Sequence, residues 1–318
     1  TGNYFDDTLA ADTTYTISNA GAVQAFQLEV TGGAASIYTV SGASYDSKAF
    51  SVTAQGGSPL GIAFKPDGTK MYVTQGGTTR TVSEYALSTA WVINTASYTT
   101  NKTLGYNDLS GIFFKPDGTT MYVLTYANDS VAQISLSTAW DVSTAGVTGT
   151  LKSVSAQETF PVGIAFKPDG TKMYVCGTSS NSVHEYNLST AWSVSSASFN
   201  QSYSVSSEGQ SVQGVAFSTD GTKMFVSANL PDSVFEYDLN TAWDISTASY
   251  SSITFSFSSQ DTIARTIAFK PDGTKLYLMG DANNTVFQYS SGGTEAYTLT
   301  WPSSIEWAGG IAPAAPAN

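Results

Sequence analysis

Gly163–Val175 reads GIAFKPDGTKMYV, and four closely similar stretches recur along the chain. The other copies are Gly61–Val73 (GIAFKPDGTKMYV), Gly111–Val123 (GIFFKPDGTTMYV), Gly214–Val226 (GVAFSTDGTKMFV) and Thr266–Leu278 (TIAFKPDGTKLYL). Each copy has two alternating apolar runs around an Asp-Gly turn, in which proline usually presets φ and glycine accepts a positive φ. Each copy therefore predicts a β-hairpin, whose strands we name A and B.

Two further strands complete each repeat. Strand C follows as in Val183–Leu188, then a Trp-containing linker as in STAWSVSSAS from Ser189, then strand D as in Ser249–Phe257. Four antiparallel strands every fifty residues or so, without helical periodicity, are typical of a β-propeller blade. The repeat therefore predicts an all-β, five-bladed β-propeller.

The last repeat lacks both the Trp linker and strand D. Ala43–Val52 (ASYDSKAFSV), ahead of the first repeat, resembles the D strands of the other repeats. We expect this N-terminal strand to close the ring, because a blade without its outer strand would expose unpaired backbone groups.

Residues 1–41 and 294–318 stand outside the repeat and contain alternating, strand-like runs. The sequence predicts a small terminal β-module built from both chain ends, which anchors or assembles the protein, and a propeller over 42–293.

Composition excludes several functions. The net charge is −12 and the chain has only two arginines, so it lacks the basic surface that nucleic acid requires. No apolar run has the length of a membrane span, which argues against membrane insertion. One cysteine (Cys176) and one histidine (His184), both at packing positions of the repeat, argue against zinc and Ser-His chemistry. We expect no metal, cofactor or catalytic residue.

The blades differ from one another on one face only. The A–B turns and C–D linkers share one face and are nearly identical, whereas the D–A and B–C connections on the opposite face diverge. Candidate binding residues on this variable face are Asp108, Tyr126, Asn128, Asp129, Glu158, Asn181, Glu208, Gln210, Gln213, Asp232, Asp261, Arg265, Asp281 and Asn283. Such amides, carboxylates and a tyrosine suit carbohydrate binding, while ordinary solvated loops are an equally good interpretation.

A glycosidase would need two carboxylates at a defined separation on rigid elements. The strand A starts carry Leu60, Ser110, Val162, Gln213 and Arg265, none of them acidic. An enzyme is therefore the less favoured hypothesis.

Thr298–Pro313 (TLTWPSSIEWAGGIAP) resembles a module of bacteriophage tail and other virion proteins. The repeats resemble propellers of phage and bacterial surface proteins and, more loosely, lactonase-like propellers. This resemblance implies a non-enzymatic tail or fibre-associated virion protein on the virion surface or outside the cell. Its implied partners are other virion subunits, through the terminal module, and a host-surface glycan or receptor. A bacterial cell-surface lectin or adhesin is the alternative, a glycoside hydrolase or lactonase-like enzyme is the third hypothesis, and a homo-oligomer stays open.

Overall fold

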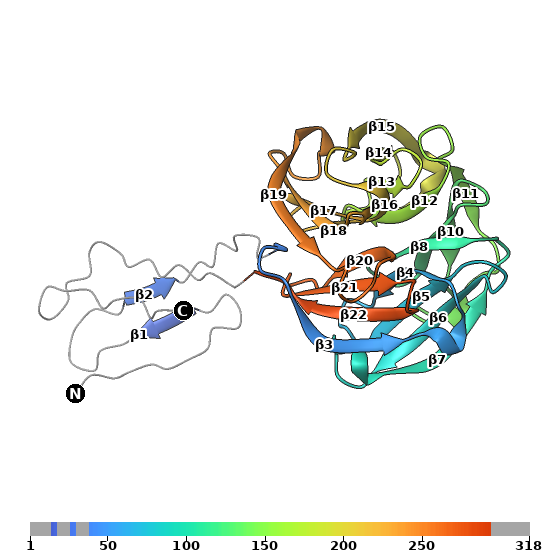
Figure 1. Cartoon of the computed structure of the whole chain (residues 1–318), viewed down its shortest axis with the longest axis horizontal. Coiled ribbons are helices and arrows are strands. Elements are labelled where there is room, and N and C mark those ends of the chain that lie inside the picture. Colours follow the sequence, from blue (N-terminus) through green and yellow to red (C-terminus); the bar gives the residue numbers. More distant parts are fainter. Residues whose placement is uncertain (1–13, 18–25, 30–37, 294–318) are drawn as a thin grey trace, which may run out of the picture. The chain divides into compact units, whose positions relative to one another are not determined.

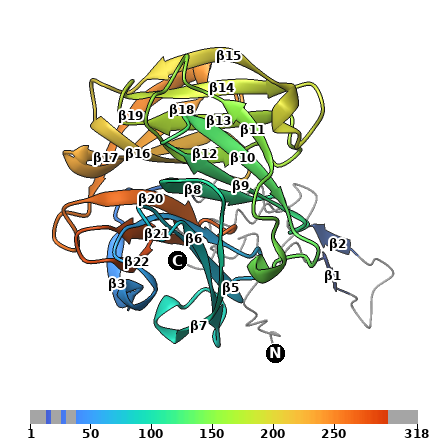
Figure 2. The ribbon, with the colours of Figure 1, turned by 90° about the vertical axis from the view of Figure 1, so that its right-hand side faces the viewer.

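The A–B hairpin of each repeat forms the inner half of a four-stranded antiparallel sheet. The computed structural model describes residues 14–17, 26–29 and 38–293. Within them, five such sheets are arranged as blades around a central axis (Figures 1 and 2). The prediction of an all-β, five-bladed propeller is confirmed.

The blades follow one another in sequence, with strands A to D running outward from the axis. Blade 1 holds β4 (Pro59–Phe64), β5 (Lys70–Gln75), β6 (Thr81–Leu87) and β7 (Ala96–Thr103); blade 2 holds β8 (Leu109–Phe114), β9 (Thr120–Thr125), β10 (Ser130–Ser135) and β11 (Thr150–Ser153). Blade 3 holds β12 (Pro161–Phe166), β13 (Lys172–Gly177), β14 (Ser182–Leu188) and β15 (Ala197–Ser204); blade 4 holds β16 (Gln210–Phe217), β17 (Lys223–Leu230), β18 (Asp232–Leu239) and β19 (Ala248–Ser256). Blade 5 holds β20 (Ala264–Phe269), β21 (Lys275–Gly280), β22 (Thr285–Ser290) and β3 (Ser44–Ser51).

Short 3-10 turns precede the first strand A and each of the four outer strands that follow a Trp linker. They are η1 (Thr53–Gln55), η2 (Ile93–Thr95), η3 (Val142–Thr144), η4 (Val194–Ser196) and η5 (Ile245–Thr247). No helix of the described residues is long and apolar enough to cross a membrane.

The ring closes through an N-terminal strand, as the sequence predicts. β3 pairs antiparallel with β22, with Tyr45 opposite Tyr289, and the two strands lie side by side in both views (Figures 1 and 2). The outer strand of the last blade therefore comes from the start of the chain, and β22 keeps no unpaired edge.

Closure begins before β3. Tyr38 takes the place that tryptophan has in the other linkers: its ring lies 5.4 Å from Phe269 and its hydroxyl donates to the Pro271 carbonyl at 2.6 Å. Two residues later, the Val40 N–H donates to Glu236 Oε2 at 2.9 Å. The compact propeller unit accordingly spans Tyr38–Gly293, four residues more than the 42–293 expected from the repeat.

The other unit contains one described hairpin. β1 (Thr14–Ile17) and β2 (Phe26–Glu29) pair antiparallel, with Thr14 opposite Glu29. The rest of the expected terminal module, including 294–318, lies outside the described residues.

Aromatic rings hold neighbouring blades together. Trp192 packs on Phe166 of its own blade, with ring centroids 5.5 Å apart, and on Tyr122 of blade 2 at 6.3 Å. The Tyr122 hydroxyl also donates to the Trp192 carbonyl at 2.6 Å. Burying such a ring contributes about 1.5–3 kcal/mol, so these contacts are a main source of ring stability. The tyrosines of strand B and the linker tryptophans thus fill the blade interfaces.

Candidate functional site

A guanidinium stands at one mouth of the axis, where strand A of blade 5 begins. Arg265 Nε and Nη2 both donate to Asp281 Oδ2, at 3.1 and 2.6 Å. Its Nη1 donates to Gln213 Oε1 of blade 4 at 3.2 Å, and the Gln213 amide is itself held by the Ser211 carbonyl at 3.2 Å. The side chains of Arg265 and Asp281 keep 22% and 17% exposure. The guanidinium is thus oriented by two blades and still reaches solvent.

Blade 2 brings a tyrosine and a carboxylate to the same mouth. Tyr126 stacks on Phe160, with ring centroids 4.4 Å apart. Burial raises the pKa of Tyr126, and the neighbouring Asp108 and Asp281 carboxylates raise it further, while Arg265 acts in the opposite direction. Charges from blades 2 and 5 therefore act on one hydroxyl. We name Asp108, Tyr126, Gln213, Arg265 and Asp281 the axial polar site.

Glu158 belongs to the fold and not to this site. It is 1% exposed, and its carboxylate accepts hydrogen bonds from the backbone N–H groups of Phe160, Ser179 and Ser180 at 2.8, 3.1 and 3.1 Å. A Cβ at Gly177 would lie 2.6 Å from the Glu158 carboxyl carbon. The carboxylate fills the space of a missing side chain and ties the B–C tip to the D–A loop.

Asp261 does the same in blade 5. It is 2% exposed and accepts from the N–H groups of Ile263 and Asn283 at 2.8 and 3.1 Å. Gly280 stands opposite it as Gly177 stands opposite Glu158. In blade 1 the two positions are exchanged: the glycine, Gly56, lies in the D–A loop, and the large side chain, the buried Gln75, lies at the end of strand B. Each of these three blades thus pairs one large polar side chain with one glycine, which indicates that Glu158 and Asp261 serve packing.

His184 and Cys176 are packed inside blade 3. The His184 ring lies 2.8 Å from Ser180 Oγ through Nε2 and 2.7 Å from Ser202 Oγ through Nδ1. Ser180 Oγ also donates to Glu158 Oε2 at 2.7 Å, so its hydroxyl proton is directed away from the imidazole. Burial lowers the pKa of His184 and raises the pKa of the Cys176 thiol. Neither residue is set up as a base or a nucleophile.

The other candidate residues mostly shape the loops of the variable face. Asn181 Oδ1 accepts from Ser211 N at 2.8 Å, and Glu208 Oε2 accepts from the Tyr237 hydroxyl at 3.2 Å. Burial, together with Asp261, raises the pKa of Asp232. Asn128, Asp129, Gln210 and Asn283 lie at B–C tips or D–A strand starts. Of the fourteen candidates, five therefore form the axial polar site.

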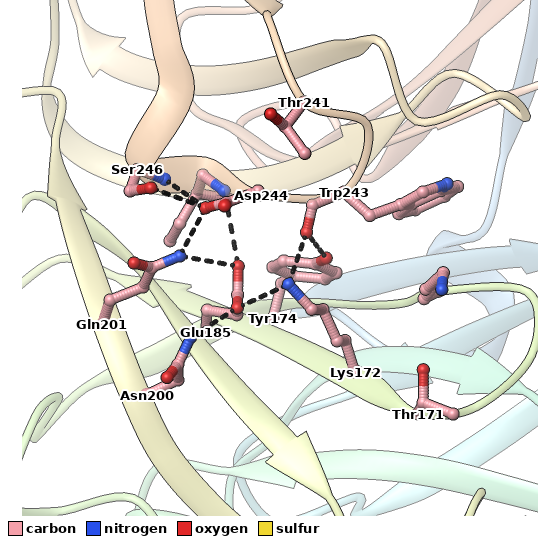
Figure 3. Close-up of polar contacts among 12 residues, drawn as sticks. Thr171, Lys172, Tyr174, Glu185, Asn200, Gln201, Thr241, Trp243, Asp244 and Ser246 are labelled. Atoms are coloured by element: carbon pink, nitrogen blue, oxygen red, sulfur yellow. Dashed lines mark hydrogen bonds and ion pairs between the residues drawn. The ribbon is translucent and has the colours of Figure 1, made fainter.

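A second polar cluster, which the sequence analysis did not single out, joins adjacent blades (Figure 3). Glu185 is 0% exposed, and its carboxylate accepts from Lys172 Nζ and Asn200 Nδ2 at 2.8 Å each and from Ile245 N at 3.4 Å. Lys172 Nζ and the Tyr174 hydroxyl both donate to the Trp243 carbonyl, at 2.9 and 2.7 Å. We name this arrangement the blade latch.

The latch recurs around the ring with exchanged side chains. Blade 1 uses Lys70 and Glu84, whereas blade 2 uses Thr120 and Gln133 at the same positions; Gln133 Oε1 accepts from Val194 N at 3.0 Å. An acidic residue on strand C opposite the strand B tyrosine, with a lysine two residues before that tyrosine, is the signal that could have revealed it. Because the uncharged Thr120 and Gln133 join blades 2 and 3 in the same way, we interpret the blade latch as structural.

No three histidine, cysteine, aspartate or glutamate side chains gather as a metal site in 14–17, 26–29 and 38–293. The chemistry open to the axial polar site is that of a carboxylate, a phenol, an amide and a cation. A carboxylate can take a proton from water, and a fixed guanidinium can stabilise an oxyanion.

The protein is thus a β-propeller with a polar site at one mouth of its axis. A family model described as "Lactonase, 7-bladed beta-propeller" matches residues 33–193, just over half of the chain. The chain belongs to this lactonase family, although it forms five blades.

Solved structures with a similar fold include lactonases. A putative 6-phosphogluconolactonase from Bacteroides uniformis has 14% identity and a TM-score of 0.47, covering 72% of this chain and 65% of its own. The periplasmic gluconolactonase of Pseudomonas aeruginosa has 13% identity and a TM-score of 0.46, with coverages of 73% and 66%. A putative 6-phosphogluconolactonase from Bacteroides fragilis has 12% identity and a TM-score of 0.48, with coverages of 73% and 80%. The chain thus spans about two thirds of the length of the first two. No curated protein matches the chain.

The family match corrects the functional expectations drawn from the sequence. The phage virion resemblance was wrong, and so were the tail-fibre function, the lectin or adhesin alternative and the expectation of no enzymatic activity. The physical reason is that the FKPDGTKMYV hairpins and STAW linkers meet demands of turn geometry and blade packing, which propellers of any function share. The loose resemblance to lactonase-like propellers was the correct one.

Proposed function

We propose that this protein is a lactonase, a hydrolase that opens a small sugar lactone at the axial polar site. Membership of the lactonase family supports the reaction class. The observation that carries the assignment of the site is Arg265, which Asp281 and Gln213 orient while its side chain keeps 22% exposure. Asp108 and Tyr126 lie at strand ends of the same face, just before β8 and just after β9.

Each residue has a role in this proposal. Asp108 takes a proton from water as the water oxygen attacks the lactone carbonyl carbon. Arg265, held by Asp281 and Gln213, stabilises the oxyanion that forms. The ring C–O bond then breaks, the leaving oxygen takes up the proton, and the product is a hydroxy acid. Tyr126 positions the sugar hydroxyls.

The test measures hydrolysis of glucono-1,5-lactone and of its 6-phosphate at mildly acidic pH, where the uncatalysed reaction is slow. Arg265→Gln and Asp108→Asn should each lower kcat/KM by about 100-fold or more. Arg80→Gln is the matched control, because Arg80 is the other arginine and its Nη1 donates to Asn107 Oδ1 at 2.8 Å. Among the described residues it forms no hydrogen bond or ion pair with a side chain of the axial polar site.

Arg80→Gln should retain activity within about twofold. A wild-type rate no higher than that of buffer for both lactones would refute the proposal. An equal loss of kcat/KM in Arg265→Gln, Asp108→Asn and Arg80→Gln would show that Arg265 has no specific role in the reaction.

A further inference from the structure

One cavity among the described residues lies away from the axial polar site. It has a volume of about 370 Å³ and is centred on the axis at the face of the A–B turns. None of Asp108, Tyr126, Gln213, Arg265 and Asp281 lines it. The cavity is therefore separate from that site, and we name it the aromatic funnel.

The wall of the funnel is almost entirely apolar. The final phenylalanine of every strand A lines it, together with three linker tryptophans and four turn prolines. These residues are Phe64, Phe114, Phe166, Phe217, Phe269, Trp91, Trp140, Trp243, Pro66, Pro116, Pro168 and Pro271. Ring faces and proline edges offer dispersion contacts and few hydrogen bonds.

The funnel narrows where the inner strands converge. A Cβ on Gly163 would lie 2.8 Å from Gly214 Cα of the next blade, so the backbones of neighbouring blades are in direct contact at this level. Thr266 takes this position in blade 5, and its hydroxyl accepts from Ile62 N at 3.0 Å. The funnel therefore begins at the turn face and narrows toward a crowded level of the axis.

One blade departs from the five-fold pattern. Phe113 stands where the other blades carry Ala63, Ala165, Ala216 and Ala268. Its ring stacks on Trp192 at 6.3 Å and 19°, and Trp192 is the linker tryptophan that does not line the funnel. The fold therefore accepts phenylalanine at this alanine position, where the Phe113 ring covers Trp192.

The rim carries no uncompensated cation. Each turn lysine is paired with the aspartate two residues on, as in Lys65 with Asp67 and Lys115 with Asp117, both at 2.7 Å. The corresponding pairs Lys167–Asp169 and Lys270–Asp272 lie at 2.7 and 2.5 Å. The blade 4 turn has Ser218 in place of lysine, and Asp220 accepts from Ser218 Oγ and from Thr222 N instead. An anionic ligand would therefore find no unpaired lysine at these turns, whereas an uncharged apolar one would lose no hydrogen bonds on entering.

We propose that the aromatic funnel binds an uncharged aromatic or alicyclic small molecule. The volume lies within the range of small-molecule pockets, and the lining matches an apolar ring. Such a ligand occupies the face opposite the axial polar site, so its binding does not depend on lactone hydrolysis.

The test uses the full chain and the neutral fluorophore N-phenyl-1-naphthylamine, titrated by its fluorescence and by quenching of tryptophan emission. Ala268→Phe introduces the side chain that blade 2 already carries and should weaken binding about tenfold or more, because it fills the funnel. Phe113→Ala widens the funnel and uncovers Trp192, and should bind at least as tightly as the wild type.

Arg265→Gln is the control that separates the two proposals, and it should leave the affinity for the fluorophore unchanged. Melting curves show whether each variant is folded. Absence of saturable binding to the wild type would overturn the proposal, as would equal affinity of folded Ala268→Phe and the wild type.

Discussion

Replacing Glu185 by glutamine tests the blade latch most directly. In Glu185→Gln the amide oxygen can still accept from Ile245 N, as Gln133 does from Val194 N. Lys172, 2.8 Å away, loses its counter-ion. Removing one partner of a fully buried ion pair costs about 3–5 kcal/mol. Because the Lys172 side chain is 23% exposed, water compensates in part and we expect about 2–3 kcal/mol.

The measurement is equilibrium unfolding in urea, followed by tryptophan fluorescence, with melting by calorimetry as a second readout. A loss of this size lowers the melting temperature by about 4–12 °C in a domain of this size. Lys115→Thr is the control, since Lys115 forms a surface pair with Asp117 and should cost less than about 0.5 kcal/mol.

The double variant Lys172→Thr/Glu185→Gln reproduces the Thr120 and Gln133 pair of blade 2. It should recover about 1 kcal/mol or more relative to Glu185→Gln, because no buried cation is left without a partner. A single-variant loss below about 0.5 kcal/mol, or a double variant no more stable than the single, would refute this account of the latch.

Three further predictions concern closure and the turns. Deleting Ala43–Val52 removes β3 and exposes the edge of β22, so it should cause unfolding or aggregation; an unchanged melting temperature would contradict ring closure. Tyr38→Ala removes a ring that is 4% exposed and should cost about 3–5 kcal/mol in urea unfolding, while Tyr38→Trp, which copies the other linkers, should be far milder. Hydrogen bonds from Lys115 and Thr119 lower the pKa of Asp117 to about 2, so its contribution is present above about pH 4 and is lost as pH falls toward 2. Asp117→Asn should reduce the pH dependence of the urea midpoint in that interval, and an identical dependence would argue against the Asp117 contribution.

Much of the fold could be predicted because its determinants are local and repeated. The Asp-Gly turns, the alternation of the strands and the resemblance of Ala43–Val52 to strand D all lie in short stretches of sequence. The start at Tyr38 was missed, since a tyrosine replaces the tryptophan that marks the other linkers.

The candidate site was harder to predict because polarity alone does not distinguish loop packing from binding. Glu158 and Asp261 look like loop carboxylates in the sequence, yet both are buried and bonded to backbone N–H groups. Arg265 and Tyr126 come from blades 5 and 2, and their proximity at the axis depends on how the ring is assembled.

The sequence by itself determined the number of blades, their four strands and the strand that closes the ring, because turn chemistry and alternation act over a few residues. Only the tertiary structure decided which polar groups face solvent and which serve the fold. It also showed that five phenylalanines from five repeats converge on one cavity. Such convergence depends on packing among blades about fifty residues apart in the chain, and no local pattern records it.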